Sequence, residues 1–299
     1  MSVLVGEHTH VSVLRGLRLL GPGGQISWVD ADDDGRMNAY HLSELAARAP
    51  GGLIVCGQAG STDCGSVDPL AEIAAITHAH GGWLHLDAAF GMWAAASPAL
   101  RPRLNGLERA DSWACDGHKW LNTPYDCGMA LCARPAALHE AVGFSADYLH
   151  TTEREGRDPM DHRVEISQRA RALTLWAILH HLGHDGIATM IERNCATARE
   201  VARRLTREPG IRLLAPVTLN QVLLHVGDEI DTRQMVDTLN SSGSCWVTIT
   251  TWHGHAAVRV SVSNWQSGSE SAETTAAFIR AHRHPTGGAP LEQTRTPAK

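Results

Sequence analysis

The chain has 299 residues, which is enough for a large α/β domain and a smaller second one, and 43% of the residues are hydrophobic. Its formal charge at pH 7 is −6, and it has no basic patch of the kind that binds nucleic acid. No run approaches the roughly 18 consecutive apolar residues of a membrane helix. The first ten residues lack the basic region and the apolar core of a signal peptide.

Cysteine and histidine usage bears on compartment and on metal binding. The seven cysteines are odd in number and scattered, with no CxxC pair, which favours a reducing compartment over a disulfide framework. We therefore expect a cytoplasmic protein. The 18 histidines include close pairs such as His8 and His10, but none is accompanied by the cysteine or carboxylate set of a zinc site. We expect no structural metal.

Short apolar runs alternate with helical patterns along the first half of the chain. The patterns predict strands at 3–5, 28–30, 53–55 and 81–91, and helices at 10–20, 42–48 and 69–80. This alternation is typical of a parallel sheet covered by helices. The polar turn DADDDG at 30–35 lacks the spacing and the closing glutamate of an EF-hand, so we do not interpret it as a calcium loop.

The second half changes character after a further strand predicted at 129–132. Amphipathic helices are predicted at 167–181 and 186–207, and strands of a smaller domain around 213–226, 245–250 and 257–262. We expect a large domain at 1–145, a mobile loop with connecting helices at 146–200, and a small C-terminal domain at 201–284. Residues 285–299 have the composition of a disordered tail.

Lysine is rare in this chain, which makes Lys119 informative. The sequence has 26 basic residues, of which only Lys119 and the terminal Lys299 are lysines. An internal lysine that persists against this preference for arginine suggests chemistry that arginine cannot perform. A lysine amine can lose its proton and form a Schiff base with an aldehyde or ketone, whereas arginine stays protonated. A surface lysine with its stem packed on apolar atoms is the alternative.

A candidate acidic partner precedes Lys119 by 32 residues. The run GGWLHLDAAFG, residues 81–91, reads as a buried strand with Asp87 at its carboxyl end. A carboxylate there costs several kcal/mol to bury unless it has a cationic partner. Ligands of open α/β sheets bind outside the carboxyl ends of the strands. A lysine for a Schiff base and an acid for the pyridinium nitrogen are the groups that pyridoxal phosphate (PLP) requires.

Three motifs carry a family resemblance. They are His118-Lys119-Trp120 within DGHKWLNTPYDCG, the DAAFG of Asp87–Gly91, and GSTDCGSVDPL at Gly60–Leu70. In this order and spacing the chain resembles the group II PLP-dependent decarboxylases, which include aromatic-amino-acid, histidine, glutamate and diaminobutyrate decarboxylases. The resemblance runs from about His10 to Trp265. It implies the aspartate aminotransferase-like α/β fold, fold type I, with a mostly parallel sheet, flanking helices and a small C-terminal α+β domain.

The resemblance also implies cofactor-binding roles for individual residues. Lys119 would hold PLP as a Schiff base, Asp87 would pair with its pyridine nitrogen, and Ala89 would lie beneath its ring. His10 matches a histidine that stacks on the ring and that could assist proton transfer, the alternative being a solvated helix cap. His118 would shape the substrate side of the site.

Two further matches concern the substrate. Thr62 matches a small hydroxyl residue near the Cα or carboxylate of the bound amino acid, although relatives often have asparagines around this point. Arg259 matches an arginine near the active site. It would hold a carboxylate or the cofactor region, and a structural ion pair is an equal alternative. The amino acid itself is not indicated by the sequence.

The charged segment at 150–163 is predicted to be an exposed, mobile loop. Several relatives have a tyrosine here that returns a proton to Cα after carbon dioxide leaves. This chain has no tyrosine between Leu149 and Arg171. His150 and His162 are the nearest substitutes. Replacement of that tyrosine accompanies oxidative, aldehyde-forming chemistry in some relatives.

The family normally begins well over a hundred residues earlier, with a dimer-clasping segment and a Gly/Ser-rich turn that cradles the cofactor phosphate. Three explanations stay open: a fragment or misplaced start, a separate chain that supplies the missing part, or a natural truncation. We expect a homodimer or such a partner chain.

The leading hypothesis is decarboxylation of an amino acid to its amine, by a PLP-dependent carboxy-lyase of amino-acid metabolism. The alternatives are aldehyde-forming oxidative deamination or transamination, and a catalytically silent homologue that binds a partner chain.

Overall fold

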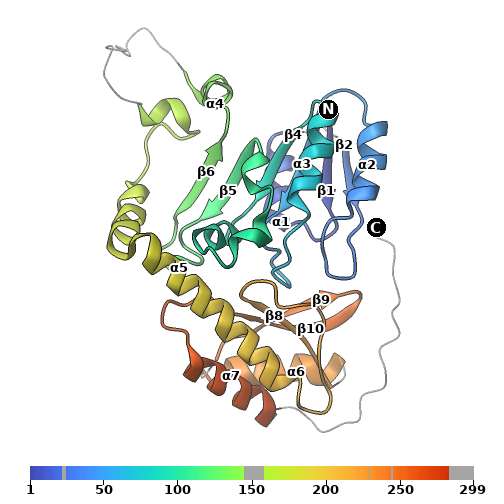
Figure 1. Ribbon diagram of the computed structural model, residues 1–299, viewed down its shortest axis with the longest axis vertical. Coiled ribbons are helices and arrows are strands. Elements are labelled where there is room, and N and C mark those ends of the chain that lie inside the picture. Colours follow the sequence, from blue (N-terminus) through green and yellow to red (C-terminus); the bar gives the residue numbers. More distant parts are fainter. Residues whose placement is uncertain (22–24, 145–157, 228, 244, 283–299) are drawn as a thin grey trace.

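The computed structural model describes residues 1–21, 25–144, 158–227, 229–243 and 245–282. His150 and the tail predicted from residue 285 onward lie outside these ranges. The described chain forms a six-stranded sheet and a four-stranded sheet, joined by one long helix (Figure 1). None of the described helices is both long enough and apolar enough to cross a lipid bilayer.

The larger sheet has the strand order β2-β1-β3-β4-β5-β6. Its strands are β1 (Ser2–Gly6), β2 (Gln25–Val29), β3 (Leu53–Gln58), β4 (Trp83–Asp87), β5 (Ser112–Asp116) and β6 (Gly128–Cys132). The first five are parallel to one another, and β6 runs antiparallel to β5. The predicted α/β architecture with a mostly parallel sheet is therefore confirmed.

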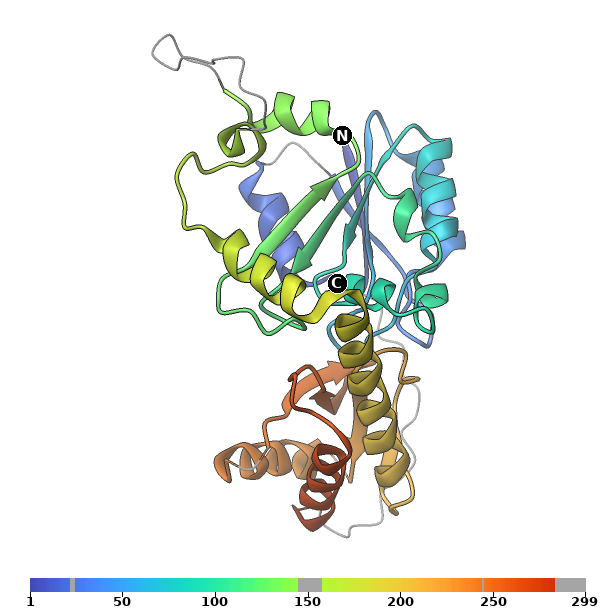
Figure 2. The ribbon, with the colours of Figure 1, turned by 60° about the vertical axis from the view of Figure 1, so that its left-hand side comes forward.

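Helices cover both faces of this sheet. On one side lies α1 (Val11–Leu19), and on the other lie α2 (Ala39–Arg48) and α3 (Leu70–Ala79) (Figure 2). Side chains of a strand alternate between its faces, so successive residues of β1 serve different cores. Val3 and Val5 pack with α1, whereas Leu4 belongs to the main core with α2 and α3. All five residues of β1 are consequently buried, as expected for an inner parallel strand.

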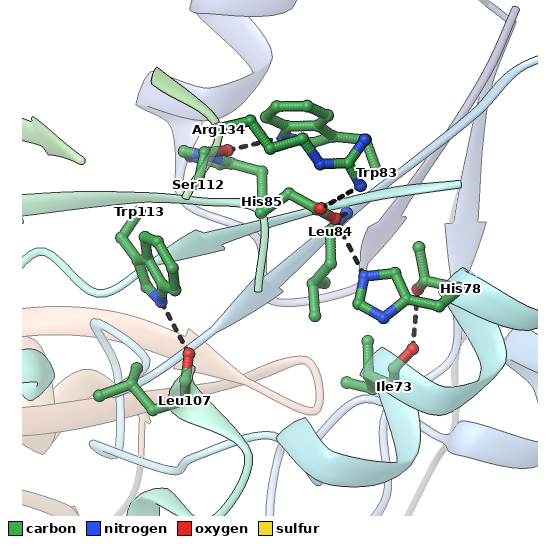
Figure 3. A network of polar contacts seen from close by, with 11 residues as sticks. Ile73, His78, Trp83, Leu84, His85, Leu107, Ser112, Trp113 and Arg134 are labelled. Carbon is green, nitrogen blue, oxygen red and sulfur yellow. Dashed lines mark hydrogen bonds and ion pairs between the residues drawn. The ribbon is translucent and has the colours of Figure 1, made fainter. Parts of the chain in front are cut away.

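A polar cluster fastens the amino ends of β4 and β5 (Figure 3). Asp111, just before β5, accepts the backbone N–H of Leu84 at 2.8 Å and pairs with His78 of α3 at 3.0 Å and with Arg134 at 2.6 Å. The Arg134 guanidinium also lies 5.1 Å from the ring centre of Trp83. This cluster is at the opposite end of the strands from Asp87 and Lys119, so its contribution is to the fold.

The smaller sheet is antiparallel and has the order β7-β8-β10-β9. Its strands are β7 (Ile211–Leu213), β8 (Gln221–Val226), β9 (Thr248–Trp252) and β10 (His255–Ser261). Two helices that the sequence patterns did not predict, α6 (Glu229–Ser241) and α7 (Ser269–His282), contribute to its core. The expected strands at 245–250 and 257–262 are present with shifted ends.

The link between the sheets is α5 (Arg171–Leu205). Gly183 interrupts it with φ of 61° and ψ of −178°, a conformation that is left-handed in φ and open to glycine at little cost. The two helices predicted at 167–181 and 186–207 are therefore the two halves of a kinked helix. Its second half packs into the core of the smaller sheet through residues such as Val201 and Leu205.

Shorter elements complete the described chain. They are α4 (Pro135–Val142) and the 3-10 turns Gly91–Ala96, Arg101–Leu104, Leu107–Arg109 and Pro159–His162.

Candidate active site

The carboxyl ends of β1, β3, β4 and β5 meet at one edge of the larger sheet, the edge that faces the smaller sheet (Figure 1). The side-chain amide of Gln58 donates to the carbonyl of His8 at 2.7 Å, which joins the ends of β3 and β1. Asp87 is the register partner of Gln58, and its carbonyl accepts the N–H of Ala59 at 2.9 Å. Most of the candidate residues from the sequence therefore lie along this edge, as expected for an open α/β sheet.

Lys119 is placed by the residue that follows it. Trp120 is fully buried, and its indole N–H donates to the side-chain oxygen of Asn194 in α5 at 2.9 Å. Asn122 adopts φ of 56° and donates to the carbonyls of Trp120 and Ser263, both at 2.8 Å. The turn after β5 is thus held to α5 through Trp120 and to the segment after β10 through Asn122. The side chain of Lys119 stays 38% exposed, so its amine is accessible.

Asp116 is a site residue that the sequence analysis missed. It ends β5, and its Oδ2 lies 3.1 Å from the amine Nζ of Lys119 and 3.6 Å from Nε2 of His118. A prediction of β5 would have found it, because Asp116 ends its strand as Asp87 ends β4, two neighbouring parallel strands. The site therefore has two carboxylates on adjacent strand ends, and Asp116 is the one that pairs with the lysine.

The ring of His118 is held by Cys127 at its Nδ1 and by the ring of Tyr125. Its Nδ1 accepts the backbone N–H of Cys127 at 3.1 Å and lies 3.0 Å from the carbonyl oxygen of the same residue. Because Nδ1 is the atom in both contacts, they correspond to the two tautomers of the neutral ring, and Nε2 is the nitrogen that faces Asp116. The ring of Tyr125 lies against it at a centroid distance of 4.2 Å. These contacts therefore fix the orientation of the His118 ring beside Lys119.

Asp87 and Ala89 lie together at the end of β4. Oδ1 of Asp87 accepts the backbone N–H of Ala89 at 3.1 Å, and both residues are half-buried. Within the described ranges no cationic side chain pairs with Asp87. The carbonyl of Ala89 accepts the N–H of Asp116 at 2.8 Å, which sets the ends of β4 and β5 side by side.

Thr62 and Arg259 are brought into direct contact across the two sheets. Nη1 of Arg259 donates to the carbonyl of Thr62 at 3.1 Å, and its Nε donates to the hydroxyl of Thr248 at 2.8 Å. The hydroxyl of Thr250 donates to Asp63 at 2.7 Å beside them. Of the two alternatives for Arg259, a structural ion pair has no support in the described residues, since its protein partners are a carbonyl and a hydroxyl.

His10 and His162 have local partners. His10 is the N-cap of α1, where its Nδ1 accepts the N–H of Ser12 at 3.3 Å and lies 2.7 Å from the Ser12 hydroxyl. The capping arrangement considered for His10 is thus observed, and a role in ring stacking stays a prediction. His162 lies against His139 of α4, with ring centres 6.2 Å apart.

Burial shifts the pKa values of Cys115 and His8, two groups near this edge. It raises the pKa of the Cys115 thiol to about 12, with the Asp116 charge adding to the effect, so this thiol next to Asp116 stays protonated. Burial also lowers the pKa of His8, against the opposing effects of Glu7 and Asp63. His8 stacks on Trp252 of the smaller sheet at 4.7 Å, and its Nε2 has no hydrogen-bond partner in the described chain.

Two hollows in the surface do not coincide with Lys119. One, of about 660 Å³, has a mostly apolar lining that includes Met92, Trp113 and Leu131. The other, of about 230 Å³, adjoins the His118 ring through Tyr125 and Cys127. The groups that can take part in chemistry lie instead around the amine of Lys119, beside Asp116 and His118.

A lysine and a carboxylate at the carboxyl edge of a parallel α/β sheet are the groups that pyridoxal phosphate requires. Residues 1–226 match the family described as the pyridoxal-dependent decarboxylase conserved domain. The chain therefore belongs to this family of PLP-dependent decarboxylases, and the resemblance carried by the motifs is confirmed.

Individual relatives agree with this assignment. The chain is 29% identical over 250 residues to an L-2,4-diaminobutyrate decarboxylase of Acinetobacter baumannii, with 81% of this chain and 49% of the relative covered. It is 26% identical over 278 residues to a phenylacetaldehyde synthase of Arabidopsis thaliana, covering 87% and 57%. The chain spans about half the length of the curated relatives that it matches.

The fold is shared with a crystal structure of Oryza sativa TDC with PLP and tryptamine. The TM-score is 0.87 at 23% identity, with 94% of this chain and 62% of the other covered. The predicted fold class, fold type I with a small C-terminal sheet, is therefore confirmed.

Proposed function

We propose that this chain carries the site of a PLP-dependent carboxy-lyase that converts an amino acid to its amine. The observation that carries the proposal is the position of Lys119, the single internal lysine. It follows β5 directly, beside the end of β4 that bears Asp87. Membership in a decarboxylase family and the accessible amine both support this function.

The residues at the strand ends fit the cofactor. Lys119 would hold its aldehyde carbon, and Asp87 would hold its ring nitrogen, because the carboxylate has a backbone N–H as its protein partner and no cation in the described chain. Ala89 is small enough for a ring to lie on the sheet. His10, which the family resemblance matches to a ring-stacking histidine, would contribute a contact to the ring. When bound, the cofactor accepts the electron pair that remains on Cα after carbon dioxide leaves.

We assign the substrate side of the site to His118, Thr62 and Arg259. His118 is fixed with Nε2 directed into the site, where it would hold or donate a proton. Thr62 would contact the amino acid, and Arg259 holds the carbonyl of Thr62 in place. Nη2 of Arg259 is not used in these bonds and would be the nitrogen that receives a carboxylate.

The experiment that tests this function uses the scarcity of lysine. The purified chain is mixed with PLP, reduced with borohydride and digested, and the peptides of Lys119 and Lys299 are examined by mass spectrometry. We expect the reduced cofactor on Lys119, and we expect Lys119→Ala and Lys119→Arg to lose it. Amino acids are then screened for release of carbon dioxide. Cofactor retained in Lys119→Ala, or found on Lys299 alone, would contradict the proposal and favour the catalytically silent alternative.

Aldehyde formation is the second candidate. Two observations favour it: the segment between Leu149 and Arg171 contains no tyrosine, and one relative is named a phenylacetaldehyde synthase. This reaction consumes dioxygen and water and releases aldehyde, ammonia and hydrogen peroxide along with carbon dioxide. Measuring dioxygen uptake and amine yield in the same assay separates the candidates. Amine formed without dioxygen uptake supports decarboxylation alone.

A further inference from the structure

The carboxylate of Asp116 has a fixed place at the end of β5. Its backbone N–H donates to the carbonyl of Ala89 at 2.8 Å, and its own carbonyl accepts the indole N–H of Trp93 at 2.9 Å. Gly128, its register partner on β6, leaves room for the side chain, since a Cβ at that position would lie 3.2 Å from Oδ1 of Asp116. Both backbone bonds come from the segment that follows Asp87, so the two acids are held relative to each other.

The side chain of Asp116 lies beside both basic groups of the turn. Its Oδ2 lies 3.1 Å from Nζ of Lys119 and 3.6 Å from Nε2 of His118. The side chains of Asp116 and His118 are 21% and 13% exposed, so they form the sheltered part of the group, whereas the lysine extends further into solvent. In the described residues, Asp116 is the one acid that pairs with Lys119.

We propose that Asp116 is the positioning residue of Lys119. Its carboxylate holds the ammonium of Lys119 at the end of β5. Asp87 then remains available to pair with the ring nitrogen of the cofactor. This inference deepens the proposed function and rests on it for the catalytic meaning of the contact. The contact itself can be tested without any cofactor.

The contacts by which Asp116 supports the fold do not use its carboxylate. The bonds that hold Asp116 to Ala89 and Trp93 use its backbone N–H and carbonyl, and these remain when the side chain is replaced. Asp116→Asn is nearly isosteric and removes the charge that holds the lysine. We therefore expect this variant to keep its fold and to change the reactivity of Lys119.

The experiment measures acetylation of Lys119 relative to Lys299 within the same molecule. The chain is treated with a limiting amount of acetic anhydride at constant pH. Peptide mass spectrometry then gives the ratio for the two lysines, separately from the N-terminal amine. Because exposed ion pairs contribute modestly, we expect the ratio to rise about two- to fivefold in Asp116→Asn. Asp116→Glu keeps the carboxylate, and we expect it to restore most of the protection.

Two other acids serve as comparisons. Asp126 lies on the same turn and pairs with Arg169 and Arg171, so Asp126→Asn should leave the ratio unchanged. Asp87→Asn should also leave it unchanged, because Asp87 does not contact the lysine. If the acetylation ratio rises in Asp87→Asn as much as in Asp116→Asn, the inference that Asp116 is the acid that positions Lys119 is overturned.

Folding of each variant is checked by circular dichroism and by its unfolding midpoint. If Asp116→Asn does not fold, Asp116→Ser gives the same test with a smaller side chain. An unchanged ratio in a folded Asp116 variant would overturn the inference. Since acetylation involves no PLP, this result is independent of whether the proposed decarboxylation is observed.

Discussion

Replacing Asp111 by asparagine tests the polar cluster at the amino ends of β4 and β5. The Asp111 side chain is 7% exposed and accepts bonds from Leu84, His78 and Arg134 (Figure 3). Asparagine is nearly isosteric and keeps an oxygen for the N–H of Leu84. It removes the charge that the two basic side chains share, so the change isolates the electrostatic part of the cluster.

The magnitude follows from the exposure of the partners. Arg134 is 59% exposed and His78 is 37% exposed, so water screens both pairs and each contributes up to about 1 kcal/mol. The bond from the N–H of Leu84 changes from charge-assisted to neutral, which costs about 1 kcal/mol more. We expect the free energy of unfolding to fall by roughly 2–3 kcal/mol, which lowers the midpoint by roughly 4–12 °C for a chain of this size.

The effect should depend on pH with a defined sign. Burial alone would raise the pKa of Asp111, but the bonds from Leu84, His78 and Arg134 outweigh it and hold the pKa below its ordinary value. A carboxyl whose pKa is lower in the folded state stabilises the fold above its unfolded pKa, about 3.9, and loses this contribution as pH falls through the folded value. The difference between wild type and variant should be full at pH 7 and shrink below about pH 4.

Thermal unfolding followed by circular dichroism at pH 7 and at pH 3 measures both quantities. Asp185→Asn is the matched control, because Asp185 also contacts a histidine, His184, but is fully exposed. We expect no measurable change in that variant. A loss below about 0.5 kcal/mol for Asp111→Asn at pH 7, or an equal loss at both pH values, would refute the reasoning.

Two further predictions concern the edge that bears the site. A Cβ at Gly91 would lie 1.9 Å from the carbonyl oxygen of Ala59, so we expect Gly91→Ala to cost roughly 1–3 kcal/mol in urea unfolding. Gly16→Ala on α1 meets no atom within 4 Å and should stabilise by roughly 0.5–1 kcal/mol; equal effects would contradict this account. Burial raises the pKa of Asp68 to about 6, above its unfolded value, so its carboxyl favours folding below about pH 4 and this contribution is lost as pH rises through 6. Wild type should thus lose roughly 2–3 kcal/mol of stability relative to Asp68→Asn between pH 4 and pH 7, and a constant difference would be inconsistent with the buried carboxyl.

Much of the larger sheet was predictable because its strands are buried on both faces. Continuous apolar runs such as those of β1 and β3 have few other structures open to them in a soluble chain. The kink of α5 was also visible, since the helical pattern is interrupted near Gly183. The strand ends in the smaller sheet were less predictable: β9 alternates between half-buried and exposed residues, which gives a weak pattern.

The contacts that place the site were not predictable from local patterns. The bond between Trp120 and Asn194 joins residues 74 positions apart, and the bond from Arg259 to Thr62 spans 197 positions. Such pairs depend on how the two sheets are placed, and no periodicity within a strand encodes this. Asp116 was missed for a different reason. The short strand Ser112–Asp116 was not among the predicted strands, so nothing marked Asp116 as a strand end beside Lys119.

The two acids show how the local sequence gives different partners to the last residues of two neighbouring strands. Asp87 and Asp116 end neighbouring parallel strands, and the backbone bond between Ala89 and Asp116 holds their strand ends together. After Asp87 come two alanines, which offer a backbone N–H and no charge, so its carboxylate has no cation in the described chain. After Asp116 come a glycine, His118 and Lys119, and the turn brings both basic groups back to the carboxylate. Asp116 lies two residues beyond Ala114, the register partner of Asp87, so the same residue type at two neighbouring strand ends gives one acid without a cation and one acid paired with Lys119.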